Sequence, residues 1–379
     1  MVVWDPAFRA YDFGPNHPFQ ERSRELAVGL LEAVDPPSGA GRRVRVDRVP
    51  VASRADLLKF HHAPYLDLVE RRSGPDRGPP LDGGDTPSFP GCFEAAARVV
   101  GGALRGAEGL ANGEVRRAFH PAGGLHHAHP NAASGFCIFN DIGMVIASHV
   151  GPGRAFGKVA YIDIDAHHGD GVMYGFYDSG RVLDIDFHQD GRTLFPGTGH
   201  VRETGVGDGA GLKVNLPLPP GAGDEVLLTA FRRVVPTMLR TFRPELIVLQ
   251  HGVDGHVGDR LAGLRYGPGG YAAVLRELLA LSEELCRGRI LVTGGGGYAS
   301  ANVARVLARA GLLIAGSPEP NGRLPEEWRR RFEAETGEAA PREWTDPEPS
   351  PTTRGDPEAA EFLVDELSQQ LGVRFPALP

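Results

Sequence analysis

The stretch from Val159 to Gly171, VAYIDIDAHHGDG, constrains the fold more than any other part of the chain. Its first six residues are apolar and rich in β-branched side chains, as expected for a central strand that is covered on both faces. Because side chains alternate along an extended strand, Asp163, Asp165 and His167 fall on the same side. A buried carboxylate without a partner is strongly unfavourable, so this group needs a cation or several hydrogen-bond donors.

The polar end of this strand indicates a metal site. A lone Asp-x-Asp pair would fit a metal site no better than a strand end whose acids are solvated and whose neighbouring histidines cap a helix. The full run Asp-x-Asp-x-His-His-Gly-Asp-Gly is far more specific, because it gathers five ionisable groups beside glycines that allow a tight turn. Oxygen and nitrogen donors without a thiolate suit zinc, iron(II), manganese or cobalt.

Composition narrows the class of protein. The 379 residues suffice for one large α/β domain or two smaller ones, and the formal charge of −8 comes with no block of Lys or Arg, so we expect no nucleic-acid partner. Cys92, Cys137 and Cys286 have no CxxC spacing, which favours a reducing, cytoplasmic location. The N-terminus lacks a signal-peptide pattern, and no apolar run approaches the roughly 18 residues that a membrane span needs.

Strands alternate with helices along most of the chain, which predicts a parallel α/β sheet. The expected strands are 44–49, 115–120, 159–164, 182–188, 212–216, 245–250 and 289–293. The expected helices are 18–34, 53–71, 93–110, 141–150, 224–240, 271–286 and 299–314. From Ser317 the composition turns to Pro, Glu, Arg and Thr, with two weaker helices at about 325–333 and 357–371. We expect this tail to lie outside the core.

Polar side chains follow several of these strands at the point where each strand ends. They are His126 and His127, Asp165 and His167, Asp254, and Tyr298. Because parallel sheets place ligands outside the carboxyl ends of their strands, these loops should converge. Two carboxylates and one imidazole leave an open position for water, as in catalytic metal sites.

Seven motifs in this order resemble the zinc-dependent histone deacetylase family, in particular its bacterial acetoin-utilisation (AcuC-like) members. They are YDFGPNHP from Tyr11, AGGLHHA from Ala122, ASGFCIFND from Ala133, YIDIDAHHGDG from Tyr161, LFPGTG from Leu194, QHGVDGHVGD from Gln250 and GGGGY from Gly294. The resemblance implies an arginase/deacetylase fold, with an eight-stranded parallel sheet flanked by helices. Residues 1–316 would form the deacetylase catalytic domain, and 317–379 a Pro/Glu-rich extension.

The resemblance also implies the chemistry of the site. His127 would act as general base toward water and then as acid toward the leaving amine, while His126 would stabilise the transition state electrostatically. Asp163 and Asp170 would orient these two imidazoles. Tyr298 would donate its hydroxyl to the developing oxyanion.

The implied metal ligands are Asp165, His167 and Asp254, with zinc as the expected ion and iron(II) as the alternative. The family also holds a structural potassium ion through backbone carbonyls at the same strand end, together with a hydroxyl residue and the residue that follows it. In this chain Asp186 and Phe187 stand at those two positions, so a carboxylate replaces the hydroxyl. That substitution predicts either tighter binding of a monovalent ion or a remodelled site.

A narrow tube for the methylenes of a lysine side chain is implied as well. Phe136 and Phe195 would wall it, and Gly135 would keep it slim. The other residues expected to contact substrate are Gly296 and, at the rim, Asp85 and Leu261. The family commonly has a proline at the position of Leu261. Arg22 and Cys137 would lie around an inner acetate pocket. We interpret Cys137 as a packing residue and not a nucleophile, because no base is placed beside it.

Acetyl-lysine in a protein is the substrate that these observations favour, with a metabolic enzyme such as acetyl-CoA synthetase as a candidate partner. Acetylpolyamines or other small acetylated amines are the alternative. A ureohydrolase of the arginase fold would need two adjacent metals and more bridging carboxylates, and an inactive binding module would not need His127 and Tyr298. GGGGYA from Gly294 fits a dinucleotide fingerprint, but a ribose-binding acid does not follow it. Oligomeric state is left open.

Overall fold

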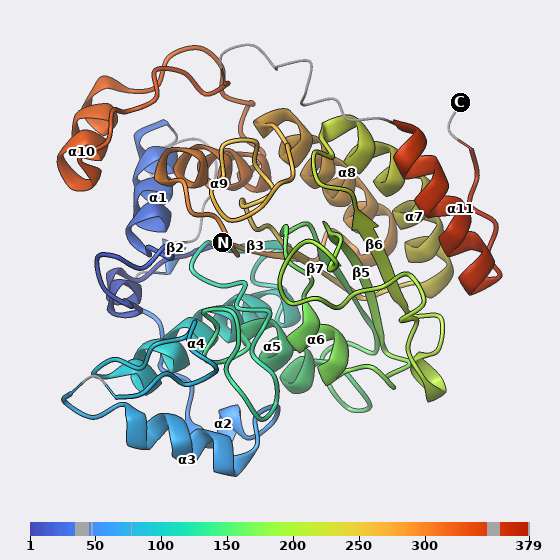
Figure 1. Ribbon diagram of the computed structural model, residues 1–379, viewed down its shortest axis with the longest axis horizontal. Helices are drawn as coiled ribbons and strands as arrows, with labels where there is room; N and C mark the ends of the chain where they lie inside the picture. The colour runs from blue at the N-terminus through green and yellow to red at the C-terminus, as the bar shows by residue number, and fades with distance from the viewer. Residues whose placement is uncertain (35–44, 47, 77, 347–356, 378–379) are drawn as a thin grey trace.

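One parallel sheet organises the chain. The computed structural model describes residues 1–34, 45–46, 48–76, 78–346 and 357–377 (Figure 1). Its strands are β1 Val2–Val3, β2 Arg45–Val46, β3 Arg117–His120, β4 Val159–Asp163, β5 Val182–Gln189, β6 Lys213–Leu218, β7 Leu246–Gln250 and β8 Ile290–Thr293. They form an eight-stranded sheet in the order β2-β1-β3-β8-β7-β4-β5-β6, and every pair is parallel. The predicted fold class is confirmed; residues 44 and 47 of the expected strand 44–49 lie outside the described residues.

Helices cover both faces of this sheet (Figure 1). They are α1 Arg22–Val34, α2 Arg54–Leu57, α3 Ala63–Arg72, α4 Cys92–Ala111, α5 Asp141–His149, α6 Asp170–Gly175, α7 Asp224–Phe242, α8 Pro268–Cys286, α9 Ser300–Ala315, α10 Glu326–Thr336 and α11 Pro357–Leu371. Strand β4 shows why two layers form: Ala160 and Ile162 enter the core beneath α7, α8 and α9, whereas Val159 and Tyr161 enter the core beneath α4 and α5. A strand buried on both faces must be apolar throughout.

The register of the central strands places the polar residues at one edge. Asp163, the last residue of β4, pairs with Asp186 of β5 and with Gln250 of β7. Gln250 in turn pairs with Thr293 at the end of β8. The loops that follow β4, β7 and β8 therefore leave the sheet side by side, which is what brings their side chains together.

The C-terminal segment belongs to the core, so our expectation that it lies outside is wrong. In α11, Ala360, Leu363, Val364 and Leu367 are buried in the same hydrophobic cluster as α7 to α9, and α11 packs against α7 and β6 (Figure 1). Their i, i+3, i+4, i+7 spacing forms one apolar stripe, which a mostly polar composition conceals.

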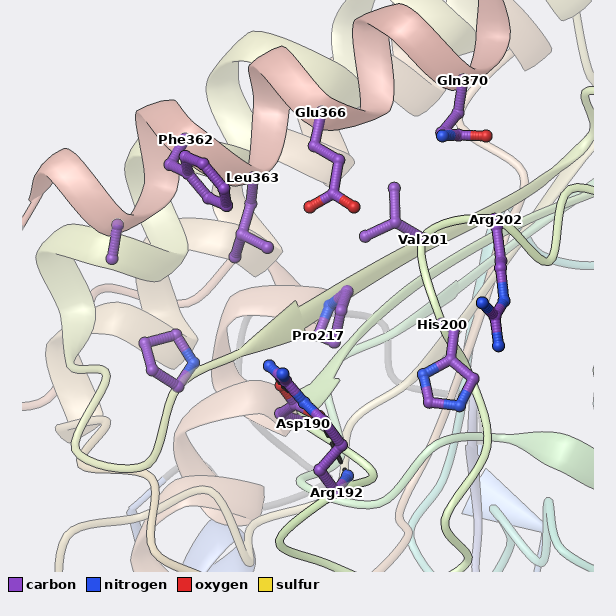
Figure 2. A pocket seen from close by; sticks show the side chains of 12 residues that line it. Asp190, Arg192, His200, Val201, Arg202, Pro217, Phe362, Leu363, Glu366 and Gln370 are labelled. Atoms are coloured by element: carbon purple, nitrogen blue, oxygen red, sulfur yellow. Dashed lines mark hydrogen bonds and ion pairs between the residues drawn. The ribbon is translucent and has the colours of Figure 1, made fainter.

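The C-terminal helix also forms one wall of a surface groove. The groove measures about 840 Å³ and is lined by Asp190, Arg192, His200, Val201, Arg202, Pro217, Pro219, Ala359, Phe362, Leu363, Glu366 and Gln370. Figure 2 shows Glu366 pointing from α11 into this space, with His200 and Arg202 on the facing loop. That loop, which follows β5, also carries Phe195.

Among the described residues, no helix is both long and apolar enough to cross a membrane.

Candidate metal centre and active site

Three buried side chains converge at the carboxyl ends of β4 and β7. Ligand atoms of Asp165, His167 and Asp254 all lie within 4.8 Å of one another. His167 Nδ1 is 2.8 Å from Asp254 Oδ2 and 3.2 Å from Asp165 Oδ1. Two carboxylates and an imidazole, without a thiolate, are a donor set that suits a divalent ion such as zinc.

The far oxygen of each carboxylate is held by the protein, which turns the other oxygen toward this centre. Asp165 Oδ2 accepts hydrogen bonds from Gln250 Nε2 (2.8 Å) and from the backbone N–H of Gly296 (2.7 Å). Asp254 Oδ1 accepts the backbone N–H of Ala166 (2.8 Å). A Cβ at position 296 would lie 2.0 Å from Asp254 Oδ2, so only glycine fits there. These residues fit a divalent cation, because their orientation is fixed before binding.

Electrostatics favour the same conclusion. Burial and the charge of Asp165 raise the pKa of Asp254 to about 7. Burial lowers the pKa of His167, but the charges and hydrogen bonds of Asp254 and Asp165 outweigh burial and raise it to about 10. The protein alone therefore keeps a proton among these groups, and a bound cation would displace it.

Two histidines from the loop after β3 point at the same place. Nδ1 of His126 lies 2.7 Å from Asp163 Oδ2, and Nδ1 of His127 lies 2.7 Å from Asp170 Oδ1. Their Nε2 atoms are 3.1 Å apart. Each carboxylate accepts a hydrogen bond from the Nδ1–H of its histidine, so the Nε2 atoms face the pocket.

The two imidazoles differ in basicity because their surroundings differ. Burial lowers the pKa of His126, but the charges of Asp163 and Asp165 raise it to about 10. Burial and the neighbouring positive charge of His126 lower the pKa of His127 to about 4. At neutral pH His127 is thus the member of the pair that can accept a proton.

A narrow pocket leads to this cluster. It is lined by Phe19, Gly124, Leu125, His126, His127, Gly135, Phe136, Cys137, Asp165, Gly295, Gly296 and Tyr298. Tyr298 approaches from the loop after β8, and its backbone N–H donates to Asp259 Oδ2 at 2.8 Å. Burial raises the pKa of the Tyr298 hydroxyl well above its usual value, which keeps that hydroxyl a hydrogen-bond donor. His127, Tyr298 and Asp165 therefore share one pocket.

The pocket walls are aromatic. The ring of Phe195 lies 5.1 Å from that of His127, and the ring of Phe136 lies 5.9 Å from that of Tyr298. Gly135 has a φ of +51°, and a Cβ there would lie 2.5 Å from His127 Cδ2 and 2.9 Å from Phe195 Cε1. Any larger residue at position 135 would fill the tube.

Comparison with known proteins agrees with this geometry. Residues 17–312 match the model of the histone deacetylase domain. The chain belongs to the histone deacetylase family. The matched stretch contains Asp165, His167, Asp254 and all of the side chains that line the pocket.

Several members of the family are similar over most of this chain. The acetoin utilization protein AcuC of Bacillus subtilis is 34% identical over 355 residues, which cover 92% of this chain and 90% of that protein. A probable deacetylase of Archaeoglobus fulgidus is 34% identical over 343 residues, covering 88% and 92%. The crystal structure of the HDA15 HD domain aligns with a TM-score of 0.74 at 26% identity, covering 84% of this chain and 91% of that one.

The family resemblance misplaces one residue. Arg22, expected in the acetate pocket, instead donates to the backbone carbonyl of Glu335. Arg24 is the arginine at the pocket: it is buried, donates to the carbonyl of Gly295 and lies 4.1 Å from the ring centroid of Phe19. Helical spacing explains the difference, because Arg24 shares the buried face of α1 with Ala27 and Leu31.

The expected rim residues lie on exposed loops. Asp85 is exposed and adjoins Thr86, whose hydroxyl accepts the backbone N–H of Phe136 at 3.0 Å. Leu261 is 38% exposed, and its N–H donates to Asp259.

Cys137 is buried in the pocket wall, and burial raises the pKa of its thiol well above the usual value, which favours packing over nucleophilic attack.

Asp186, expected beside a monovalent ion, has both carboxylate oxygens engaged. Oδ1 lies 2.7 Å from His188 Nδ1, and Oδ2 accepts the backbone N–H of Gly169 at 2.7 Å. Nε2 of His188 is held in turn by the carbonyl of Gly199 at 2.9 Å. Occupancy by potassium stays a prediction.

Sequence reasoning missed residues that hold the site from behind. Gln250 supports Asp165, the Tyr161 hydroxyl donates to Asp163, and His129 Nε2 lies 3.1 Å from Asp170 Oδ2. Tyr161 and Gln250 are the first residues of two motifs quoted above. Their place in those motifs was the signal that could have identified them.

Proposed function

We propose that this protein is a zinc-dependent deacetylase that hydrolyses the acetyl amide of acetyl-lysine in proteins. The observation that carries the proposal is the narrow aromatic pocket in which His127 and Tyr298 face the carboxylate of Asp165. A general base, a hydroxyl donor and a metal ligand in one tube are the groups that amide hydrolysis requires.

Each side chain around the proposed metal centre has a separate chemical role. A divalent cation held by Asp165, His167 and Asp254 would supply Lewis acidity and lower the pKa of water. His127, neutral and oriented by Asp170, accepts the proton of the attacking water and delivers it to the leaving amine. His126 supplies positive charge beside the developing oxyanion.

Tyr298 and the aromatic walls complete the site. The Tyr298 hydroxyl donates a hydrogen bond to the oxyanion as it forms, and preorganised donors of this kind contribute several kcal/mol. Phe136 and Phe195 align the lysine methylenes and exclude water. Arg24 donates to the carbonyl of Gly295, a residue that lines the pocket.

The carboxylates around the metal centre argue against a binuclear ureohydrolase. In the residues that the structure describes, one group of three acidic or histidine side chains has its ligand atoms close enough to hold a metal. The neighbouring carboxylates of Asp163, Asp170 and Asp186 are each engaged by a histidine. No second bridging set is left for another ion among these residues.

A polypeptide substrate is favoured by the mouth of the pocket. Phe195 is 43% exposed, Leu261 is 38% exposed and Asp85 is exposed as well, so the residues expected at the rim are accessible to a peptide backbone. The acetoin utilization relatives make a metabolic enzyme such as acetyl-CoA synthetase a candidate partner. The three cysteines are free and buried, in keeping with the proposed cytoplasmic location.

An assay of two substrates tests the proposal. Purified protein is given an acetyl-lysine peptide or an acetylpolyamine, before chelation, after it, and after zinc or iron(II) is restored. We expect turnover of the peptide that chelation abolishes and zinc restores. Equal or faster turnover of the acetylpolyamine would transfer the substrate assignment to small amines, and full activity in the chelated protein would refute the metal-dependent mechanism.

A further inference from the structure

A contact joins the C-terminal segment to the loop that carries a metal ligand. Oδ2 of Asp346 lies 3.0 Å from Nε2 of His256, and Oδ1 of Asp346 accepts a hydrogen bond from Arg305 Nη2 at 2.6 Å. His256 and Arg305 are 1% and 5% exposed, so this contact is largely shielded from solvent.

The other ring nitrogen of His256 is held by the backbone of the same loop. Nδ1 accepts the backbone N–H of Gly258 at 3.1 Å. Both ring nitrogens of His256 are therefore contacted, Nδ1 by the backbone of its own loop and Nε2 by the carboxylate of Asp346. Burial raises the pKa of Asp346, but the hydrogen bond of His256 and the charge of Arg305 outweigh burial and lower it to about 2, so this carboxylate is ionised at neutral pH.

His256 lies at the centre of the loop that shapes the site. It follows Asp254 by two residues, and its carbonyl accepts the N–H of Asp259 at 2.8 Å. Asp259 then accepts the backbone N–H of Tyr298 at 2.8 Å through Oδ2. A displacement of His256 would therefore move both a proposed metal ligand and the proposed oxyanion donor.

The segment that presents Asp346 is docked independently of that contact. Trp344 is 2% exposed, and its backbone N–H donates to the carbonyl of Gly322 at 3.1 Å. Arg305 Nη1 donates to the carbonyl of Glu343 at 3.4 Å. Removing the Asp346 carboxylate should therefore leave the segment in place.

We propose that Asp346 is a positioning residue: through His256 it fixes the loop 254–259, so that the C-terminal segment helps to assemble the metal centre and to place Tyr298. The effect on catalysis rests on the proposed function. The effect on metal affinity is measured without it.

The experiment compares the variant Asp346→Ala with the wild type and with a matched control. Asp365→Ala serves as the control, because Asp365 in α11 also faces an arginine, with Oδ1 3.6 Å from Arg233 Nη2, but lies outside the loop 254–259. Zinc affinity is measured by competition with a chromophoric chelator. Amide hydrogen exchange is followed over residues 253–261, and kcat and KM are measured on an acetyl-lysine peptide.

We expect Asp346→Ala to weaken zinc binding about tenfold, the lower range for residues that orient ligands. Exchange in the loop should become faster, and kcat should fall by a similar factor with KM nearly unchanged. Asp346→Asn, which keeps the shape and one acceptor, should show a smaller effect, and Asp365→Ala none. The double variant His256→Ala/Asp346→Ala should be no worse than His256→Ala alone, because both changes remove the same contact.

A loss of thermal stability in Asp346→Ala with unchanged zinc affinity and unchanged exchange in the loop would overturn the proposal, because it would show a packing role alone. If the wild type binds zinc but hydrolyses no acetyl amide, the proposed function fails, and the zinc affinity of Asp346→Ala still decides the role of Asp346.

Discussion

At the scale of single residues, environment separates side chains of the same type into different roles. Asp163 and Asp165 stand two positions apart in one strand end, yet Asp163 bonds His126 and Tyr161 while Asp165 faces the metal centre. His126 and His127 are adjacent, yet one is strongly basic and the other is not. The difference comes from the charges nearby: the carboxylates of Asp163 and Asp165 raise the pKa of His126, whereas burial and the positive charge of His126 lower that of His127.

Tyr298→Phe should lower kcat about 10²- to 10³-fold, the usual effect of removing one oxyanion donor. The phenyl ring keeps the contact with Phe136, and because Tyr298 is not a ligand, the metal content should not change. Steady-state kinetics and metal analysis check both. Tyr174→Phe is the control, since its hydroxyl donates to Glu203 outside the pocket. A kcat within threefold of the wild type would rule out the proposed role of Tyr298.

A buried histidine outside the site gives the protein a sensitivity to acid. The Nε2 atom of His61 accepts the backbone N–H of Asn140 at 3.0 Å, and its Nδ1 lies 3.1 Å from the carbonyl of His129. Both contacts are satisfied only by the neutral ring. Burial lowers the pKa of His61 to about 4.

Because this pKa lies below the value of about 6.5 in the unfolded chain, stability should fall as the pH drops from about 6.5 to about 4, by up to roughly 3 kcal/mol for this group. His61→Gln should reduce the slope of unfolding free energy against pH over this range by about 1.4 kcal/mol per pH unit. Urea titrations at several pH values measure it. His62→Gln, at the exposed neighbouring position, should leave the slope unchanged; equal slopes for wild type and His61→Gln would contradict the assignment.

At the scale of elements, α11 shows how a short stripe decides where a segment packs. Its buried face contacts α7 and β6, while Phe362 on the opposite side is 69% exposed. Arg233 of α7 ties the two helices together by bonding Glu361 and the carbonyl of Pro376 at 3.1 Å. The helix is thus part of the domain that holds the site.

Leu367→Ala should therefore reduce the unfolding free energy of the whole domain by about 2–5 kcal/mol, because Leu367 is fully buried. Phe362→Ala on the same helix should change it by less than about 0.5 kcal/mol. Chemical denaturation followed by tryptophan fluorescence compares them. If Leu367→Ala unfolds α11 separately and leaves the main transition unchanged, α11 is a separate unit.

At the scale of the whole molecule, the proposed metal centre joins two central strands. Asp165 and His167 follow β4, and Asp254 follows β7, its neighbour in the sheet. A ligand that binds the folded protein alone stabilises it in proportion to the logarithm of its concentration. Global stability should therefore report on occupancy of the metal centre.

Chelation should lower Tm, and added zinc should raise it again, with a gain of about 4 kcal/mol when zinc is at a thousand times its Kd. Differential scanning calorimetry over a zinc series measures this. In Asp254→Asn the same series should give a much smaller shift, because one charged ligand is gone. A Tm in the wild type that responds neither to chelator nor to zinc would contradict the proposed metal centre.

Most of the sheet and several of the residues that line the pocket could be predicted from sequence patterns. Most of the seven predicted strands are mainly apolar runs, and 44–49 was predicted from its alternation of apolar and charged residues. The ligand triad was predicted because polar groups follow strands. Strand β1, Val2–Val3, was missed, since two residues carry no periodicity. The short helix α6 was missed because it begins inside the polar motif at Asp170.

Other features depend on contacts between segments that are distant in sequence. Arg24 rather than Arg22 contacts residues that line the pocket because α1 turns one face inward, and α11 joins the core because α7 and β6 offer it an apolar surface. The contact of Asp346 with His256 spans 90 positions of sequence, from 256 to 346. Sequence pattern reports local periodicity, whereas which distant surfaces meet depends on how all the elements pack together.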